Sequence, residues 1–202
     1  MVAVQSNPSS TTVATGAELV IESLESHGVE TVFGIPGVHT LALYDALRNS
    51  SIRHVLARHE QGAGFMADGY ARATGKPGVA VVITGPGVTN IATAVGEAYT
   101  DSSPVLVISS NVESPYLDDM RGNLHDLKDQ MAVMKAVTKW NARVTAAHEA
   151  PGILNEAFER LTSGRPLPVH VEIPLDVLAQ PESADRLPRE PFIVVPEPSE
   201  EK

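Results

Sequence analysis

Two continuous apolar runs rich in β-branched residues constrain the fold of this chain most strongly. They span residues 79–84 (VAVVIT) and 104–109 (PVLVIS). Runs of this kind are typical of strands buried on both faces of a parallel sheet. Elsewhere the chain shows helical periodicity, and short junctions rich in Gly and Pro separate the two patterns. The alternation predicts an α/β fold, a three-layer open parallel sheet of about six strands with helices on both faces.

Local signals place the individual helices and strands. Thr15 and Glu18 form a capping box that begins the first helix, and Gly28 ends it. The helix after residue 60 ends at Gly75, with a proline just beyond. Further helices are expected at 40–48, 88–99, 124–134 and 153–161, and strands at 31–33, 52–57, 79–84, 104–109 and 168–173.

The charge and composition exclude several classes of function. The chain carries a formal net charge of −10, which argues against nucleic acid or an anionic membrane as the main partner. It has no cysteine, so it contains no disulfide framework and no thiolate nucleophile or metal ligand. No segment approaches the roughly 18 apolar residues of a membrane span. We therefore expect a soluble, cytoplasmic protein.

The two ends of the chain differ in composition from the part between them. Residues 1–14 are polar and are expected to form a disordered leader. Residues 181–202 combine five prolines with a surplus of acidic residues, which is typical of an extended interdomain linker. One folded domain is expected between them, over residues 15–180.

Glu60 is the strongest candidate for chemistry. It follows the strand-like run at 52–57 and directly precedes a helix. This places it at the carboxyl end of a strand, where open α/β sheets bind their ligands. Its neighbours Gly62, Ala63 and Gly64 are small, so a ligand can approach closely. The alternative is a first-turn glutamate that only complements the helix dipole.

Two further turns are expected at the same edge of the sheet. The GIPG turn (34–37) follows one expected strand, and the GPGVTN turn (85–90) follows another. Together with the turn at Glu60 they would line a cleft. The GPGVTN turn does not match a dinucleotide-binding fingerprint, because Asn90 stands where the third glycine is needed and Pro86 lacks an N–H group.

Histidines and serines give weaker signals. The seven histidines show no spacing typical of a metal site, so no metal ligand is assigned. His59 is expected to be structural, because neighbouring side chains in an extended segment point to opposite faces. His39 and His125 lie in expected loops and are candidates for substrate contact. The Ser109-Ser110 pair lacks a nucleophile elbow, which disfavours hydrolase chemistry.

Six segments in this order carry a resemblance to a known family. They are VFGIPG (32–37), RHEQGAGFMADGYARATGKPG (58–78), ITGPGVTN (83–90), the run from Asp101 to Ser110, VTKW (137–140) and GRPLPVHVEIPLDV (164–177). The chain resembles, over residues 15–178, the pyrimidine-binding domain of thiamine diphosphate-dependent enzymes of the acetolactate synthase and 2-oxo-acid decarboxylase family.

The resemblance implies a role for Glu60 and its neighbours. In the family, a glutamate at this position hydrogen-bonds a ring nitrogen of the aminopyrimidine, which favours the imino tautomer and hence the thiazolium ylid. The ylid attacks the ketone of a 2-oxo acid, and CO₂ leaves. The implied cofactor is thiamine diphosphate with Mg²⁺. The implied cofactor-binding residues are Ile35, Pro36, Gly37, Glu60, Gly85, Pro86, Gly87 and Asn90.

The resemblance also implies that the chain carries half of a site. In the family, the diphosphate and Mg²⁺ bind a second domain with a Gly-Asp-Gly…Asn motif, and each active site forms between chains of a homodimer or tetramer. The sequence has no such motif, since Asp68-Gly69 lies within an expected helix. Two explanations remain open. The chain is either a fragment cut at the linker or a natural subunit of a split enzyme, and such a subunit could be catalytic or only an assembly module. In either case the isolated chain is expected to be inactive.

The substrate within the family has two interpretations. Acetolactate synthases carry Phe-Gln-Glu where this chain has HDL (125–127), which argues against acetolactate formation, whereas Lys139 matches them. The segments 34–47 and 121–130 look closer to decarboxylases of 5-guanidino-2-oxopentanoate. Asp126 or Asp129 would then pair with the guanidinium group, and the alternative is that both acids are solvated. The candidate substrate residues are His39, His125, Asp126 and Lys139.

Overall fold

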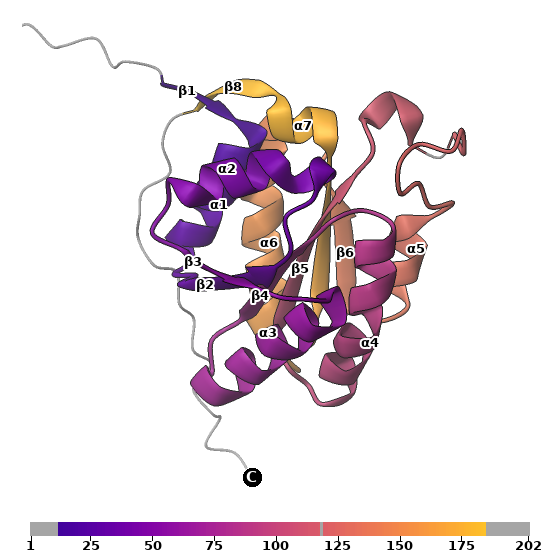
Figure 1. The fold of residues 1–202 in the computed structure, drawn as a ribbon. Helices are drawn as coiled ribbons and strands as arrows, with labels where there is room; N and C mark the ends of the chain where they lie inside the picture. Colours follow the sequence, from indigo (N-terminus) through magenta and orange to yellow (C-terminus); the bar gives the residue numbers. More distant parts are fainter. Residues whose placement is uncertain (1–11, 118, 185–202) are drawn as a thin grey trace, which may run out of the picture.

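A six-stranded parallel sheet forms the centre of the molecule (Figure 1). The structure is a computed structural model that describes residues 12–117 and 119–184. The strand order is β3-β2-β4-β5-β7-β6, and every neighbouring pair is parallel. The strands are β2 (Thr31–Gly34), β3 (Arg53–Leu56), β4 (Gly78–Val82), β5 (Val105–Asn111), β6 (Trp140–Arg143) and β7 (Val169–Pro174).

Helices cover both faces of this sheet (Figure 1). One core cluster packs one face against α1 (Gly16–Ser26), α2 (Leu41–Arg48), α6 (Ala150–Thr162) and α7 (Leu175–Ala179). A second cluster packs the other face against α3 (Glu60–Thr74), α4 (Pro86–Thr100) and α5 (Gln130–Lys135). Short 3₁₀ turns lie at η1 (Val38–Thr40), η2 (Ser114–Tyr116) and η3 (Ala147–Glu149). The predicted three-layer α/β fold is confirmed.

Burial separates the central strands from the edge strand β6. Every residue of β4, β5 and β7 is buried, because helices lie on both faces of these strands. The five strands located from the sequence are all present, with shifted ends. The sixth, β6, was not located, since its sequence WNAR forms no apolar run and its residues are only half buried.

Capping signals fix the ends of the helices as the sequence predicted. Thr15 Oγ1 accepts a hydrogen bond from Glu18 N (3.2 Å), and Thr15 N donates to Glu18 Oε2 (2.7 Å). Gly75 ends α3 with φ at 71°, a left-handed conformation that a glycine adopts without strain. Both helix-end predictions are confirmed.

The helix expected over residues 124–134 starts later in the structure than predicted. The structure contains only α5, which begins at Gln130. Asp129 caps it, since Asp129 Oδ1 accepts from Ala132 N at 2.8 Å. The preceding residues form turns, and His125 has φ at 63°. The predicted helix is therefore confirmed only from Gln130 onward.

A separate two-stranded antiparallel sheet joins the ends of the described chain. It pairs β1 (Thr12–Thr15) with β8 (Pro181–Ala184). These strands lie partly within the regions expected as leader and linker, whose remaining parts, 1–11 and 185–202, lie outside the described residues. The assignment of those parts stays a prediction. Within the described ranges, no helix combines the length and apolarity needed to cross a membrane.

Candidate functional site

Three turns lie side by side at the carboxyl edge of the sheet. Residues 35–37 follow β2, residues 58–62 lead from β3 into α3, and residues 85–90 lead from β4 into α4. The strands β3, β2 and β4 are neighbours in this order. The sheet order therefore brings together the three turns that the sequence placed at strand ends.

Glu60 is anchored through one of its two carboxylate oxygens. It is the first residue of α3, whose N-terminus is capped by His59 through a hydrogen bond from Gln61 N to Nδ1 (3.1 Å). Near the start of α4, Asn90 Nδ2 donates to Glu60 Oε2 at 2.9 Å. Within the described ranges no donor reaches Oε1. The half-buried carboxylate is thus fixed in orientation and keeps one oxygen for another partner.

Tyr44 on α2 lies close enough to Glu60 for the two groups to interact electrostatically, and it was not identified from the sequence. Its hydroxyl donates to Val81 O at 3.4 Å, and its ring meets His54 edge-on at 4.9 Å. Burial raises the pKa of Tyr44, and the negative charge of Glu60 raises it further. The phenol therefore stays neutral near Glu60. The only sequence signal was a tyrosine on the inner side of a helix, which ordinarily seeks a hydrogen-bond partner.

Two glycines are required by close approaches at these turns. Gly85 has φ at 64°, and a Cβ there would come within 2.1 Å of the His125 carbonyl oxygen. At Gly34, the first residue of the GIPG turn, a Cβ would come within 2.1 Å of the Val81 carbonyl oxygen. Larger residues would force the loop over residues 119–129 and the GIPG turn apart from the sheet edge.

His39 and His125 come together above the Gly85 turn. Their ring centroids are 6.1 Å apart, and His39 is only 6% exposed. Burial lowers the pKa of His39, and His125 lowers it further, so His39 is neutral at physiological pH. Asp126 follows in a turn in which its N–H donates to Asn123 O (3.0 Å). Three of the four candidate substrate residues therefore lie at or beside this edge.

Lys139, the fourth candidate, lies elsewhere. It precedes β6, at the amino edge of the sheet, and its Nζ donates to the carbonyl oxygens of Arg160, Ser163 and Arg165 at 2.8, 2.8 and 3.1 Å. These carbonyls end α6 and begin the following loop. The structure thus gives Lys139 a structural role as the cap of a helix end.

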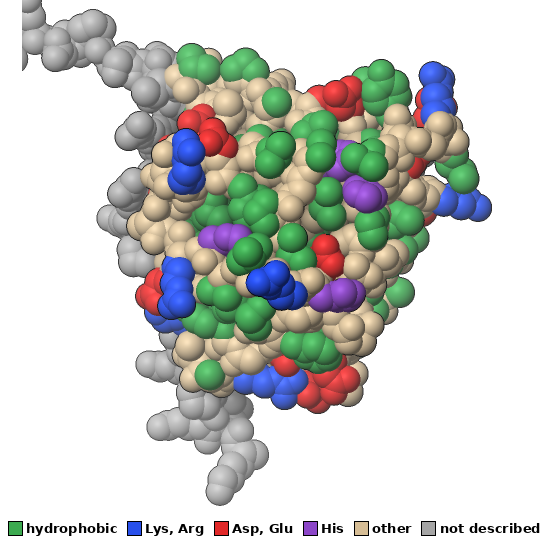
Figure 2. Space-filling model, viewed as in Figure 1, with side chains coloured by type: hydrophobic (Ala, Val, Ile, Leu, Met, Phe, Trp, Pro, Cys, Tyr) green, Lys and Arg blue, Asp and Glu red, His purple; other side chains and the backbone are tan. Residues whose placement is uncertain are grey.

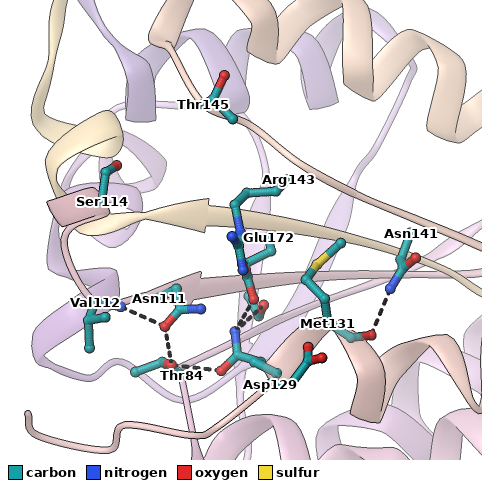
Figure 3. A network of polar contacts seen from close by, with 12 residues as sticks. Thr84, Asn111, Val112, Ser114, Asp129, Met131, Asn141, Arg143, Thr145 and Glu172 are labelled. Carbon is teal, nitrogen blue, oxygen red and sulfur yellow. Dashed lines mark hydrogen bonds and ion pairs between the residues drawn. The ribbon is translucent and has the colours of Figure 1, made fainter. Parts of the chain in front are cut away.

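A buried polar network contacts the Gly85 turn, because Gly85 N donates to Gln130 Oε1 at 2.8 Å. Figure 3 shows Thr84, Asn111, Arg143 and Glu172 of this network. Thr84 Oγ1 lies 2.7 Å from Gln130 Oε1 and 3.2 Å from Asn111 Oδ1. Glu172 is fully buried between Gln130 Nε2 (2.8 Å) and Arg143 Nε (2.5 Å). No local pattern in the sequence pointed to Gln130, because a glutamine at the start of a helix is usually exposed.

Exposed apolar side chains surround the three turns. Val38, Leu41, Leu56, Phe65 and Leu124 are between 42% and 61% exposed. Figure 2 shows apolar side chains across the face that carries α3 and α4, interspersed with charged and histidine side chains. An apolar surface of this kind is typical of a site that a further part of a protein covers. The described residues contain no group of three His, Cys, Asp or Glu side chains that could hold a metal ion.

Comparison with known proteins identifies the family. The model of the thiamine pyrophosphate enzyme N-terminal TPP-binding domain matches residues 14–133. The chain is 55% identical over 171 residues to the probable 2-ketoarginine decarboxylase AruI of Pseudomonas aeruginosa, covering 85% of this chain and 31% of that protein.

Acetolactate synthases are also similar to the chain. It is 44% identical over 166 residues to the mitochondrial catalytic subunit of Saccharomyces cerevisiae, covering 82% of this chain and 24% of that protein. It is 43% identical to the isozyme 2 large subunit of Escherichia coli, covering 80% and 29% respectively. The chain thus spans less than a third of the length of these relatives. The chain belongs to the thiamine pyrophosphate enzymes and carries their N-terminal TPP-binding domain.

Proposed function

We propose that this chain is the pyrimidine-binding half of a thiamine diphosphate-dependent 2-oxo-acid decarboxylase, with Glu60 as the residue that activates the cofactor. The observation that carries the proposal is the carboxylate at the end of β3, held through Oε2 by Asn90 while Oε1 keeps no donor among the described residues. A ring nitrogen of an aminopyrimidine needs one such oxygen with which to share a proton.

The surroundings of Glu60 fit a flat ring. Glu60 is only half buried, so its carboxylate can be approached by a ligand. The turns at 35–37 and 85–87 carry no charged side chain, and half of their residues are glycines. A planar heterocycle can therefore approach the backbone closely at this edge.

The residues of this chain would bind and orient the cofactor, and would place a proton. Asn90 fixes the rotation of the carboxylate by a charge-assisted hydrogen bond. Glu60 Oε1 would hold the proton shared with the ring. When bound, thiamine diphosphate supplies a nucleophilic carbon and an electron sink for the carbanion that remains after a 2-oxo acid loses CO₂.

The diphosphate and Mg²⁺ would bind a domain other than the one described. The chain spans 31% of the length of its decarboxylase relative, and no acidic cluster among the described residues could hold the metal. The exposed apolar side chains around the turns would pack against that second domain, in the same polypeptide or in a partner of a homodimer or tetramer. The isolated chain would then bind part of the cofactor without turning over substrate.

The proposed substrate is 5-guanidino-2-oxopentanoate, also called 2-ketoarginine. The probable 2-ketoarginine decarboxylase shares 55% identity with the chain, against 41–44% for the acetolactate synthases. His39, His125 and Asp126 would contact this substrate at the carboxyl edge. Lys139 is left out, because its ammonium group is held by three carbonyls at the opposite edge.

Reconstitution with a diphosphate-binding domain tests the proposal. We expect CO₂ release from 5-guanidino-2-oxopentanoate, and a loss of about 10²-fold or more in kcat for Glu60→Gln, the range typical of a removed acid–base group. Glu22→Gln on α1, in the other helical layer, is the matched control and should retain wild-type rates. Near-normal activity of Glu60→Gln would refute the role of Glu60 and favour a non-catalytic assembly subunit.

Carboligation is the second candidate, since several relatives are acetolactate synthases. The same reconstituted enzyme, supplied with pyruvate, would distinguish the two. Formation of acetolactate from pyruvate without CO₂ release from the guanidino acid would establish the carboligase and reject the decarboxylase.

A further inference from the structure

Gln130, the first residue of α5, connects this helix to the turn at Gly85 through hydrogen bonds that involve every polar atom of its side chain. It is only 2% exposed. Its Oε1 accepts from Gly85 N at 2.8 Å and lies 2.7 Å from Thr84 Oγ1. Its Nε2 donates to Ser110 O and to Glu172 Oε2, each at 2.8 Å, with Ser109 Oγ at 3.2 Å. Every polar atom of the side chain therefore has a partner, as buried amides require.

The chemistry of these partners allows only one orientation of the amide. Gly85 offers an N–H donor, so the atom facing it has to be an acceptor. Glu172 offers a carboxylate oxygen, so the atom facing it has to be a donor. Glu172 is itself fixed on its other oxygen by Arg143 of β6 (2.5 Å). The Glu172–Arg143 ion pair thus fixes the orientation of the Gln130 amide, whose oxygen accepts the hydrogen bond from Gly85 N–H.

The Gly85 turn in turn determines where Glu60 points. Gly85 adopts φ at 64° and ψ at −110° immediately before α4, and the next residue, Pro86, has no N–H group to anchor the turn. Asn90 lies one helical turn further along α4, and its amide holds the Glu60 carboxylate. A shift of the first turn of α4 would therefore displace Asn90 and release Glu60.

We propose that Gln130 is a positioning residue for Glu60, acting through Gly85, α4 and Asn90, and that the Glu172–Arg143 ion pair sets its orientation. The effect of Gln130 on catalysis rests on the proposed function, whereas its effect on the Gly85 turn does not. It also explains why a fully buried glutamate and glutamine lie behind an apolar site edge at a substantial cost in desolvation.

Hydrogen exchange at the Gly85 amide in the 202-residue chain tests the hold on the turn. Gln130→Met keeps the volume and removes the acceptor, so we expect the Gly85 amide to exchange about tenfold faster, the factor that corresponds to one lost hydrogen bond. Asn141→Leu is the matched control. Asn141 Nδ2 anchors the same helix by donating to Met131 O at 2.8 Å, without touching the turn. Equal exchange rates of Gly85 in the two variants would overturn the proposal.

Gln130→Glu gives a second test that keeps the side-chain shape. It places a carboxyl group against Glu172, with Arg143 on the far side of Glu172, His170 behind Ser109, and Asp129 beside it in the chain. A protonated Glu can still accept from Gly85 and donate to Glu172, whereas an ionised one repels Glu172. We expect Gly85 protection near the wild-type value at pH 5.5 and lost as the pH rises to 8. Protection that is independent of pH in this variant would contradict the proposal.

Activity in the reconstituted enzyme separates this inference from the proposed function. We expect Gln130→Met to lower kcat about tenfold with KM for the 2-oxo acid little changed, and Asn141→Leu to retain wild-type kcat. If Gly85 exchange accelerates but kcat is unchanged while Glu60→Gln is inactive, Gln130 does not position Glu60. If Glu60→Gln is fully active, the proposed function fails, and the exchange data alone decide whether Gln130 holds the turn.

Discussion

His170 should make the stability of this domain depend on pH through a single buried imidazole. It lies on β7 between β5 and β6 and is completely buried. Its Nε2 lies 2.7 Å from Ser109 Oγ, and within the described ranges its Nδ1 has no partner. Burial lowers the pKa of His170 to about 3, and the positive charge of Arg143 contributes.

The direction and size of the effect follow from linkage. In the unfolded chain the imidazole has a pKa of about 6.5. Above this pH the ring is neutral in both states and has no effect. As the pH falls, the unfolded state binds a proton that the folded state excludes, so stability decreases by up to about 1.4 kcal/mol per pH unit. The loss levels off near pH 3, and it amounts to about 2 kcal/mol between pH 7 and pH 5.

Urea unfolding of wild type and His170→Gln at pH 7, 6 and 5 measures this contribution. Glutamine keeps an amide near the Ser109 hydroxyl but does not titrate. We expect the stability difference between wild type and the variant to shrink by about 2 kcal/mol from pH 7 to pH 5, since only wild type loses stability through this group. Asn155→Gln, at an exposed position on α6, introduces and removes no titrating group and should retain the wild-type pH dependence. If wild type and His170→Gln have parallel pH dependences, the buried imidazole is not the cause.

Three further predictions concern stability and are checked by urea denaturation at pH 7. Gly85→Ala should lower the free energy of unfolding by about 2 kcal/mol or more, because its Cβ would meet the His125 carbonyl oxygen at 2.1 Å. Gly69→Ala in α3, where a Cβ would meet nothing within 4 Å, should instead raise it by up to about 1 kcal/mol. A change of the same sign in both variants would refute the argument. Lys139→Met should cost about 1 kcal/mol by releasing three carbonyls, and no change would show that solvent replaces the ammonium group. Thr15→Ala should cost about 1 kcal/mol through the lost capping box, a result that an unchanged midpoint would exclude.

The central strands could be predicted because neighbouring residues in the sequence reveal their buried environment. Strands such as β4 and β5 are buried on both faces, so they appear as unbroken apolar runs. The ends of α1 and α3 depend on contacts within three or four residues, at the Thr15 box and at Gly75. Signals of this range need no knowledge of the rest of the fold.

The edge strand β6 was missed, and the start of α5 was placed too early, because both depend on contacts with distant partners. β6 is a strand only because β7 offers it hydrogen bonds, and its own residues are half polar. In the region before Gln130, the spacing of apolar residues suggested a helix, but the structure has turns packed against Gly85. Local periodicity did not locate the start of this helix, which is set by the Asp129 cap.

Residues near one another in the chain were enough to establish the fold class, the family and the position of Glu60 at a strand end. The tertiary structure decided which side chains meet at that strand end. Asn90 reaches Glu60 across 30 residues, and Gln130 reaches Gly85 across 45. The fold also separates Lys139 from the site, because the two ends of a parallel strand lie at opposite edges of the sheet. Such contacts are set by strand order and helix packing, which no local pattern of residues encodes.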